Sequence, residues 1–133
     1  FEVHVGDDGI YCTSDDIVTF IDTLSFNDDD PEGVAYGNGR LFVTDGVGRE
    51  VNVIHWGDNG VFDGLPPDGD DTWTHFDTDS LGLRDPEGIG YHWDRGTIFM
   101  VSRNDDVLVE TDINGSVLNV YDIAGFDIFS PAG

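Results

Sequence analysis

Two loops rich in aspartate are the parts of this sequence whose residue types could do chemistry. The first loop, residues 6–16, carries Asp7, Asp8, Asp15 and Asp16. The second loop, residues 57–71, carries Asp58, Asn59, Asp63, Asp68, Asp70 and Asp71. Calcium takes roughly six to eight oxygen ligands, and clustered carboxylates with nearby carbonyls supply them without a helix. Both loops are therefore predicted to bind calcium.

The alternative interpretation is a pair of solvated loops in which Asp side chains only close turns. So many carboxylates in one short loop repel one another unless a cation or water screens them. The loops begin alike, with GDDGIY at 6–11 and GDNGVF at 57–62, and neither has the EF-hand pattern. Between Thr111 and Val117 the loop is absent, and a tight hairpin turn at Asn114-Gly115 is expected there. Because the fold does not require the acidic loop at that place, its presence at the other two places indicates that the loop has a function of its own.

Glu32 and Glu87 are the second set of candidates, because each follows Pro in a recurring tetrapeptide. DPEG occurs at 30–33 and again at 85–88, followed by VAY and IGY. A glutamate facing a channel could be a metal ligand or a general base. Alternatively, its carboxylate accepts backbone N–H groups of a turn formed by DPEG.

The same spacing recurs along the whole chain, which indicates an internal repeat. An Asp lies nine residues before Pro31, Pro86 and Pro131, at positions 22, 77 and 122. Asp22, Asp77 and Asp122 are expected to bond between neighbouring repeats.

The expected elements are all strands, since no segment keeps apolar residues at a spacing of three and four. Strands are expected at residues 1–5, 17–22, 34–36, 41–44, 50–56, 72–77, 89–91, 97–102, 107–111 and 116–122. Four short antiparallel strands in roughly 45 to 55 residues are typical of one propeller blade. The predicted fold is thus an all-β partial propeller. Residues 1–29 form the second half of a blade, 30–84 a blade with an acidic insertion, and 85–133 a blade that ends where a third unit begins.

The composition excludes several classes of partner. A net charge of −23, from 28 acidic and 5 basic residues, offers nothing to neutralise phosphates, so nucleic acid and anionic membranes are not expected to bind. No apolar run approaches the ~20 residues of a membrane span. Cys12 is the single cysteine and is expected to be a buried or partly buried thiol. An acidic surface without lysine is also typical of a salty habitat.

The motifs PEG(V/I)(A/G)Y and LFVTD resemble the inner strands of six-bladed β-propellers. These include the SdiA-regulated, β-propeller phytase-like, strictosidine-synthase-like and NHL-type families, and the chain is most similar to secreted bacterial propellers with acidic insertions. The resemblance implies an extracellular, calcium-binding module with a structural or adhesive role. In phytase-like relatives a Glu after Pro binds calcium in the central channel, which implies this role for Glu32 and Glu87. Ala132 departs from that pattern in the third copy.

The resemblance also leaves open a metal-dependent hydrolase of the phytase, lactonase or phosphodiesterase type. The sequence has no lysine to grip phosphate, no His/Cys cluster for zinc and no GxSxG motif, so no catalytic residue is assigned. Fewer than three blades cannot close a ring, and their outer faces would leave apolar surface in water. Either self-association or the remainder of a longer parent chain is expected to complete the propeller, and the sequence is expected to be an internal fragment that has lost its leader.

Overall fold

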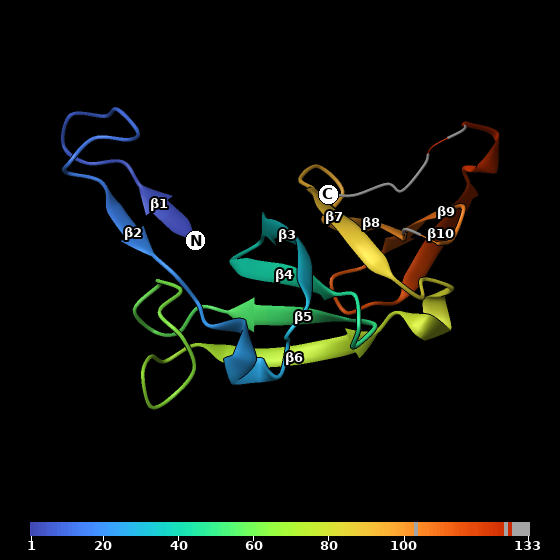
Figure 1. Cartoon of the computed structure of the whole chain (residues 1–133), viewed down its shortest axis with the longest axis horizontal. Helices are drawn as coiled ribbons and strands as arrows, with labels where there is room; N and C mark the ends of the chain where they lie inside the picture. The colour runs from blue at the N-terminus through green and yellow to red at the C-terminus, as the bar shows by residue number, and fades with distance from the viewer. Residues whose placement is uncertain (103, 127, 129–133) are drawn as a thin grey trace.

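The computed structural model describes residues 1–102, 104–126 and 128, and it is all-β (Figure 1). A two-stranded sheet pairs β1 (Glu2–His4) with β2 (Ile17–Thr19). The first four-stranded sheet consists of β3 (Pro31–Gly37), β4 (Arg40–Asp45), β5 (Glu50–His55) and β6 (Thr72–Asp77). The second consists of β7 (Pro86–His92), β8 (Thr97–Ser102), β9 (Val107–Thr111) and β10 (Val117–Asp122).

Both four-stranded sheets are antiparallel, and their strands follow one another in chain order. Figure 1 shows the three sheets side by side, with the β1–β2 hairpin at one end and β7–β10 at the other. Short 3-10 helices follow the last strand of each sheet: η1 (Thr23–Phe26), η2 (Asp79–Leu81) and η3 (Ala124–Phe126). The expected all-β class is confirmed. No helix among the described residues has the length and apolar character to cross a bilayer.

The prediction that DPEG forms a turn is wrong, because its last three residues already belong to a strand. In the first sheet Pro31 pairs with Asp45, but Gly33 pairs with Thr44, so Glu32 is the extra residue of a bulge. The second sheet has the same shift, with Pro86 opposite Ser102 and Gly88 opposite Val101. Proline is tolerated here because it is the first residue of an edge strand, where its missing N–H breaks no ladder bond.

The larger of two core clusters lies between the two four-stranded sheets, and the smaller one consists of Phe26, Val43, Ile54 and Phe62. Phe42 of the first sheet and Ile98, Met100 and Val109 of the second are fully buried in one cluster. Each such side chain contributes about 1.5–3 kcal/mol by leaving water. The Phe42 ring stacks on the Tyr91 ring, with centroids 6.1 Å apart and an interplanar angle of 10°.

Glycines in β3 let the second sheet approach this closely. A Cβ at Gly33 would lie 2.8 Å from the carbonyl oxygen of Glu87, and a Cβ at Gly37 would overlap the Tyr91 ring. The first sheet therefore presents bare backbone where β7 packs against it.

Within the described residues, the hydrogen bonds of Asp22, Asp77 and Asp122 are local and do not join neighbouring sheets, contrary to the prediction. Their Oδ1 atoms accept backbone N–H groups just ahead in the chain: Leu24 at 3.1 Å, Ser80 at 3.0 Å and Ala124 at 2.9 Å. An Asp placed just before a chain reversal reaches the nearest free N–H, as in other Asx turns. All three therefore stabilise the 3-10 turn that follows the last strand of a sheet.

Two further local expectations need correction. The β9–β10 connection is not a two-residue turn, because Asp112 accepts the N–H groups of both Asn114 and Ser116 at 2.8 Å. Type I′ turns need positive φ at both central residues, and in that loop only Gly115 has it. Asn38 and Gly39 meet the requirement instead, with φ of 53° and 72° between β3 and β4. Cys12 is exposed rather than buried.

Candidate metal site

The loop between β5 and β6 folds back on itself through its final aspartates. Asp71 accepts the N–H of Gly57 on Oδ1 at 3.3 Å and the N–H of Gly64 on Oδ2 at 2.9 Å. Asp70 Oδ2 accepts the N–H of Asp58 at 2.8 Å. The Asp pair at the end of the loop thus fixes the beginning and the middle of the loop against the start of β6.

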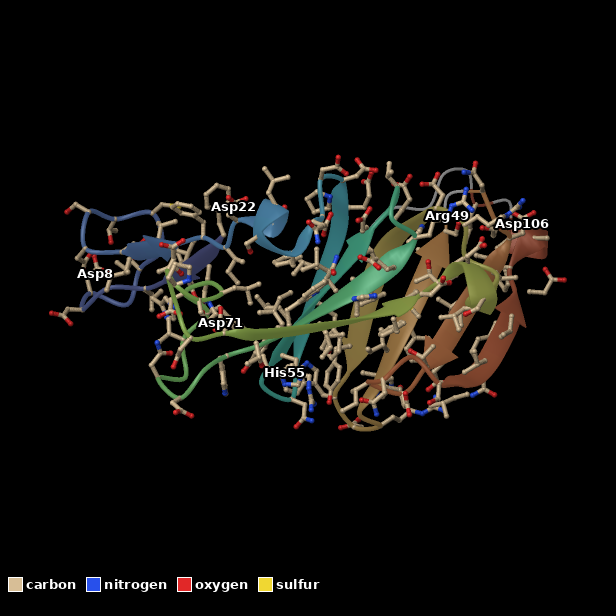
Figure 2. All side chains as sticks on the ribbon, turned by 90° about the horizontal axis from the view of Figure 1, so that it is seen from below. Asp8, Asp22, Arg49, His55, Asp71 and Asp106 are labelled. Atoms are coloured by element: carbon tan, nitrogen blue, oxygen red, sulfur yellow. The ribbon has the colours of Figure 1, made fainter. Side chains whose placement is uncertain are left out.

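Asp63 is held next to this pair by two further hydrogen bonds. Its Oδ1 accepts the N–H of Asp70 at 3.2 Å, and its Oδ2 accepts the side-chain amide of Asn59 at 2.7 Å. A Cβ at Gly69 would overlap the Asp63 carboxylate, so only glycine leaves room for it. Oxygens of Asp63, Asp70 and Asp71 consequently lie within 4.8 Å of one another. Asp71 and Asp8 mark the two acidic loops in Figure 2.

The electrostatics of this group favour a cation. Asp71 is only 1% exposed, and burial raises its pKa above the usual range. The N–H groups of Gly64 and Gly57 oppose that rise, while the charge of Asp63 adds to it. No ion pair found among residues 1–102, 104–126 and 128 involves Asp63, Asp70 or Asp71. Their repulsion is therefore not compensated by a basic side chain in the described part of the chain.

The donor set fits a hard divalent cation. All three ligands are carboxylates, which suit calcium or magnesium, whereas zinc sites use nitrogen and sulfur as well. Two oxygens bound to one calcium ion at about 2.3–2.6 Å can be no more than about 5 Å apart. The 4.8 Å limit that encloses these three oxygens meets this condition. Asp63 and Asp70 are exposed, whereas Asp71 is buried.

The loop between β1 and β2 is also closed by an Asp at its end that accepts backbone N–H groups from earlier in the loop. Asp16 accepts the N–H of Gly6 on Oδ1 at 3.1 Å, and the N–H groups of Cys12 and Thr13 on Oδ2 at 2.6 and 3.2 Å. The Thr13 hydroxyl donates to Asp15 at 2.6 Å, and this bond is the main reason that the pKa of Asp15 is lowered.

Among the described residues this first loop brings no three acidic, His or Cys side chains into a metal-sized group. Thr13 and Gly64 both donate N–H to the closing Asp, so the residue before each corresponds: Cys12 in the first loop and Asp63 in the second. The first loop therefore lacks the third carboxylate.

The other predicted ligands of the two loops lie outside the three-carboxylate group. Asp8 and Asn59 close equivalent Asx turns, accepting the N–H of Ile10 and of Val61 respectively, both at 2.8 Å. Of the remaining predicted ligands, Asp15 and Asp16 make the bonds described above, and Asp7, Asp58 and Asp68 are exposed.

Glu32 and Glu87 lie away from both loops, at the bulges that open β3 and β7. Glu87 is 9% exposed, whereas Glu32 is exposed. Gly46 lies close to Glu32, Asp30 and Asp85, since a Cβ there would be 3.0–3.3 Å from atoms of all three. These side chains form an acidic patch at the strand ends, not a group of ligand distance within the described residues.

Sequence reasoning missed three buried acids: Asp28, Asp45 and Glu110. Asp28 Oδ2 accepts the Asn52 amide at 3.2 Å, and burial, reinforced by the charge of Asp45, raises the pKa of Asp28 to about 6. Glu110 is fully buried, which opposes its ionisation, but bonds from Asn119, Thr97 and Tyr121 and the charge of Arg95 lower its pKa overall. The burial of Glu110 could have been predicted, because it is a glutamate inside the apolar run 107–111. Asp28 offered no such signal, since it is one of three consecutive aspartates.

No protein-family model matches this sequence, and no curated protein matches it. The fold and the site together define an all-β protein in which one loop gathers three carboxylates. The function is therefore inferred from the geometry of that loop.

Proposed function

We propose that this chain is a calcium-stabilised part of a β-propeller, with a structural or adhesive role in an extracellular protein. The observation that carries the proposal is the approach of Asp63, Asp70 and Asp71 within 4.8 Å of one another, on a loop whose Asp71 is buried. A calcium ion there offsets the repulsion of the carboxylates and holds the loop against β6. Calcium is thus a structural ligand of the folded chain.

The propeller part of the proposal is supported by the two four-stranded sheets. They have the same strand order and the same bulge after the first proline, and their first strands β3 and β7 lie next to each other (Figure 1). Meandering four-stranded sheets packed face to face are the building unit of propellers. Each sheet then corresponds to one blade, and the β1–β2 hairpin to half of another.

The extracellular part is supported by the number and exposure of the ligands. Asp63 and Asp70 are exposed, and only three carboxylates take part. Sites in extracellular modules bind calcium with Kd of roughly 10⁻⁴ to 10⁻³ M, whereas intracellular calcium-buffer proteins bind it far more tightly. We expect the Kd of this site to lie in the same weak range. The site would then be occupied only in a medium rich in calcium.

Thermal unfolding with calcium and with chelator tests the proposal. At 10 mM calcium, Kd of about 10⁻³ to 10⁻⁴ M stabilises the folded chain by about 1.4 to 2.7 kcal/mol, which raises Tm by several degrees. Asp63→Asn should remove most of this increase. Asp68→Asn is the matched control, because Asp68 lies in the same loop, is exposed and is outside the group. An equal Tm in calcium and in chelator would contradict the proposal.

A further inference from the structure

A pocket of about 250 Å³ lies between the first four-stranded sheet and the β9–β10 loop of the second. The sheet lines it with Arg40 of β4, Val53 and His55 of β5 and Thr74 of β6, and the loop lines it with Asn114. Figure 2 labels His55, which is the last residue of β5. Neither acidic loop lines this pocket, so it is separate from the candidate metal site.

Arg40 lacks the partner that other arginines of this chain have. The other arginines within residues 1–102 and 104–126 each bind a carboxylate: Arg49, Arg84 and Arg95. The Nε–H of Arg40 donates instead to the His55 ring at 3.2 Å, and its Nη1 is buried with no hydrogen-bond partner among the described residues. A buried donor without an acceptor costs free energy, which an acceptor brought into the pocket would recover.

His55 does not compensate the charge of Arg40. Burial, and then the charge of Arg40, lower the pKa of His55, so its ring is neutral at pH 7. The ring accepts a hydrogen bond but contributes no negative charge. Within the described residues the guanidinium therefore has no anion beside it, although the chain has a net charge of −23.

The second sheet has a carboxylate at the equivalent position. In the first sheet Val53 of β5 lies opposite Thr74 of β6, and in the second sheet Glu110 of β9 lies opposite Asn119 of β10. Both Thr74 and Asn119 come three residues before the Asp that ends the last strand of their sheet. The pocket thus has a valine where the second sheet has a buried glutamate.

Four side chains hold the Glu110 carboxylate: Asn119 at 2.8 Å, Thr97 at 2.9 Å, Arg95 at 3.1 Å and Tyr121 at 3.2 Å. Thr97 is the first residue of β8, as Arg40 is of β4, so Arg40 has the place of one Glu110 partner. Thr74 has the place of Asn119 and offers a hydroxyl donor. The first sheet therefore has a cation and a donor at this position, but Val53 supplies no carboxylate.

We propose that this pocket binds a short-chain monocarboxylate, at the position that the Glu110 side chain has in the second sheet. The Arg40 guanidinium binds the carboxylate, the Thr74 hydroxyl and the Asn114 amide donate to it, and Val53 contacts its short apolar chain. Beyond its Cα, a glutamate side chain has the composition of propionate, so propionate is the probe. The proposal rests neither on calcium nor on the propeller.

The charge of the chain selects a single negative charge. A net charge of −23 repels a phosphate dianion more strongly than a monoanion. A carboxylate also accepts two parallel hydrogen bonds from one guanidinium, which a chloride ion cannot do. We therefore expect propionate to bind more tightly than inorganic phosphate or chloride.

Calorimetric titration of the full chain with propionate tests the proposal, and we expect Kd on the order of 1 mM. Arg40→Gln should weaken binding at least about 10-fold, because it removes the charge-assisted hydrogen bonds. Arg49→Gln is the matched control. It changes the net charge equally, but Arg49 is bound to Asp79 outside the pocket, so propionate should bind this variant as it binds the unmodified chain.

Val53→Glu is the converse test, because it introduces the missing carboxylate. The new side chain should bind Arg40, fill the pocket and abolish propionate binding, and circular dichroism checks that each variant is folded. If Val53→Glu does not fold, the comparison of Arg40→Gln with Arg49→Gln decides alone. No binding at about 20 mM propionate, equal binding by the Arg40→Gln variant and the unmodified chain, or phosphate or chloride binding as tight as that of propionate would each overturn the proposal.

Discussion

Asp63 accepts the backbone N–H of Asp70 at 3.2 Å, so one acidic residue fixes the position of another of like charge. The bond places the two carboxylates on the same side of the loop, where Asp71 also lies. A loop that served only solubility would gain from keeping these charges apart. Their proximity is what the proposed calcium ion explains.

The first prediction concerns the buried carboxyl of Asp28. Because its pKa is raised to about 6 in the folded chain, the folded state holds this proton more tightly than the unfolded state does. The contribution of Asp28 to stability is therefore greatest at low pH and is lost as pH rises from about 4 to about 6. Asp28→Asn should remove this loss and stabilise the chain at pH 7, by up to about 3 kcal/mol.

Denaturant unfolding between pH 4 and pH 7 measures this effect. Asp29→Asn serves as the control, because Asp29 is adjacent in sequence but exposed. The prediction fails if the Asp28→Asn variant loses stability between pH 4 and pH 6 as steeply as the unmodified chain does.

The second prediction concerns the contact between β3 and β7. Gly37→Ala should destabilise the chain by about 1–3 kcal/mol, because the new methyl group would overlap the Tyr91 ring and force the sheets apart. Gly90→Ala in β7 is the control, since nothing lies within 4 Å of a Cβ built there. Chemical unfolding compares the two variants, and equal stabilities would show that the sheets do not pack as described.

Most of the strands could be predicted from residue pattern, because runs such as Leu41–Thr44 and 97–102 combine β-branched and aromatic residues. The bulges at Glu32 and Glu87 could not, since Pro and Gly indicate a turn as readily as the irregular start of an edge strand. At the candidate site, composition identified both loops as acidic. Which carboxylates meet depends on how each loop folds back, and spacing along the chain does not reveal that.

The third prediction concerns a substitution that gives the first acidic loop the third carboxylate of the second loop. Cys12→Asp introduces a carboxylate at the position that corresponds to Asp63, next to Asp15 and Asp16. Asp tolerates the positive φ of 69° found at Cys12 better than most residues do. Calorimetric titration with calcium should find one additional weak site per chain. The control is Cys12→Asn, which has a similar shape but no charge and should add no calcium site. If the Cys12→Asp variant and the unmodified chain bind the same number of calcium ions, the two loops do not correspond.

The most direct measurement is a crystal structure grown in 10 mM calcium, with anomalous diffraction used to locate the ion. The account predicts an anomalous peak in the loop between β5 and β6, bonded to oxygens of Asp63, Asp70 and Asp71 at about 2.3–2.6 Å. Well-ordered density for all three side chains with only water between them would contradict it.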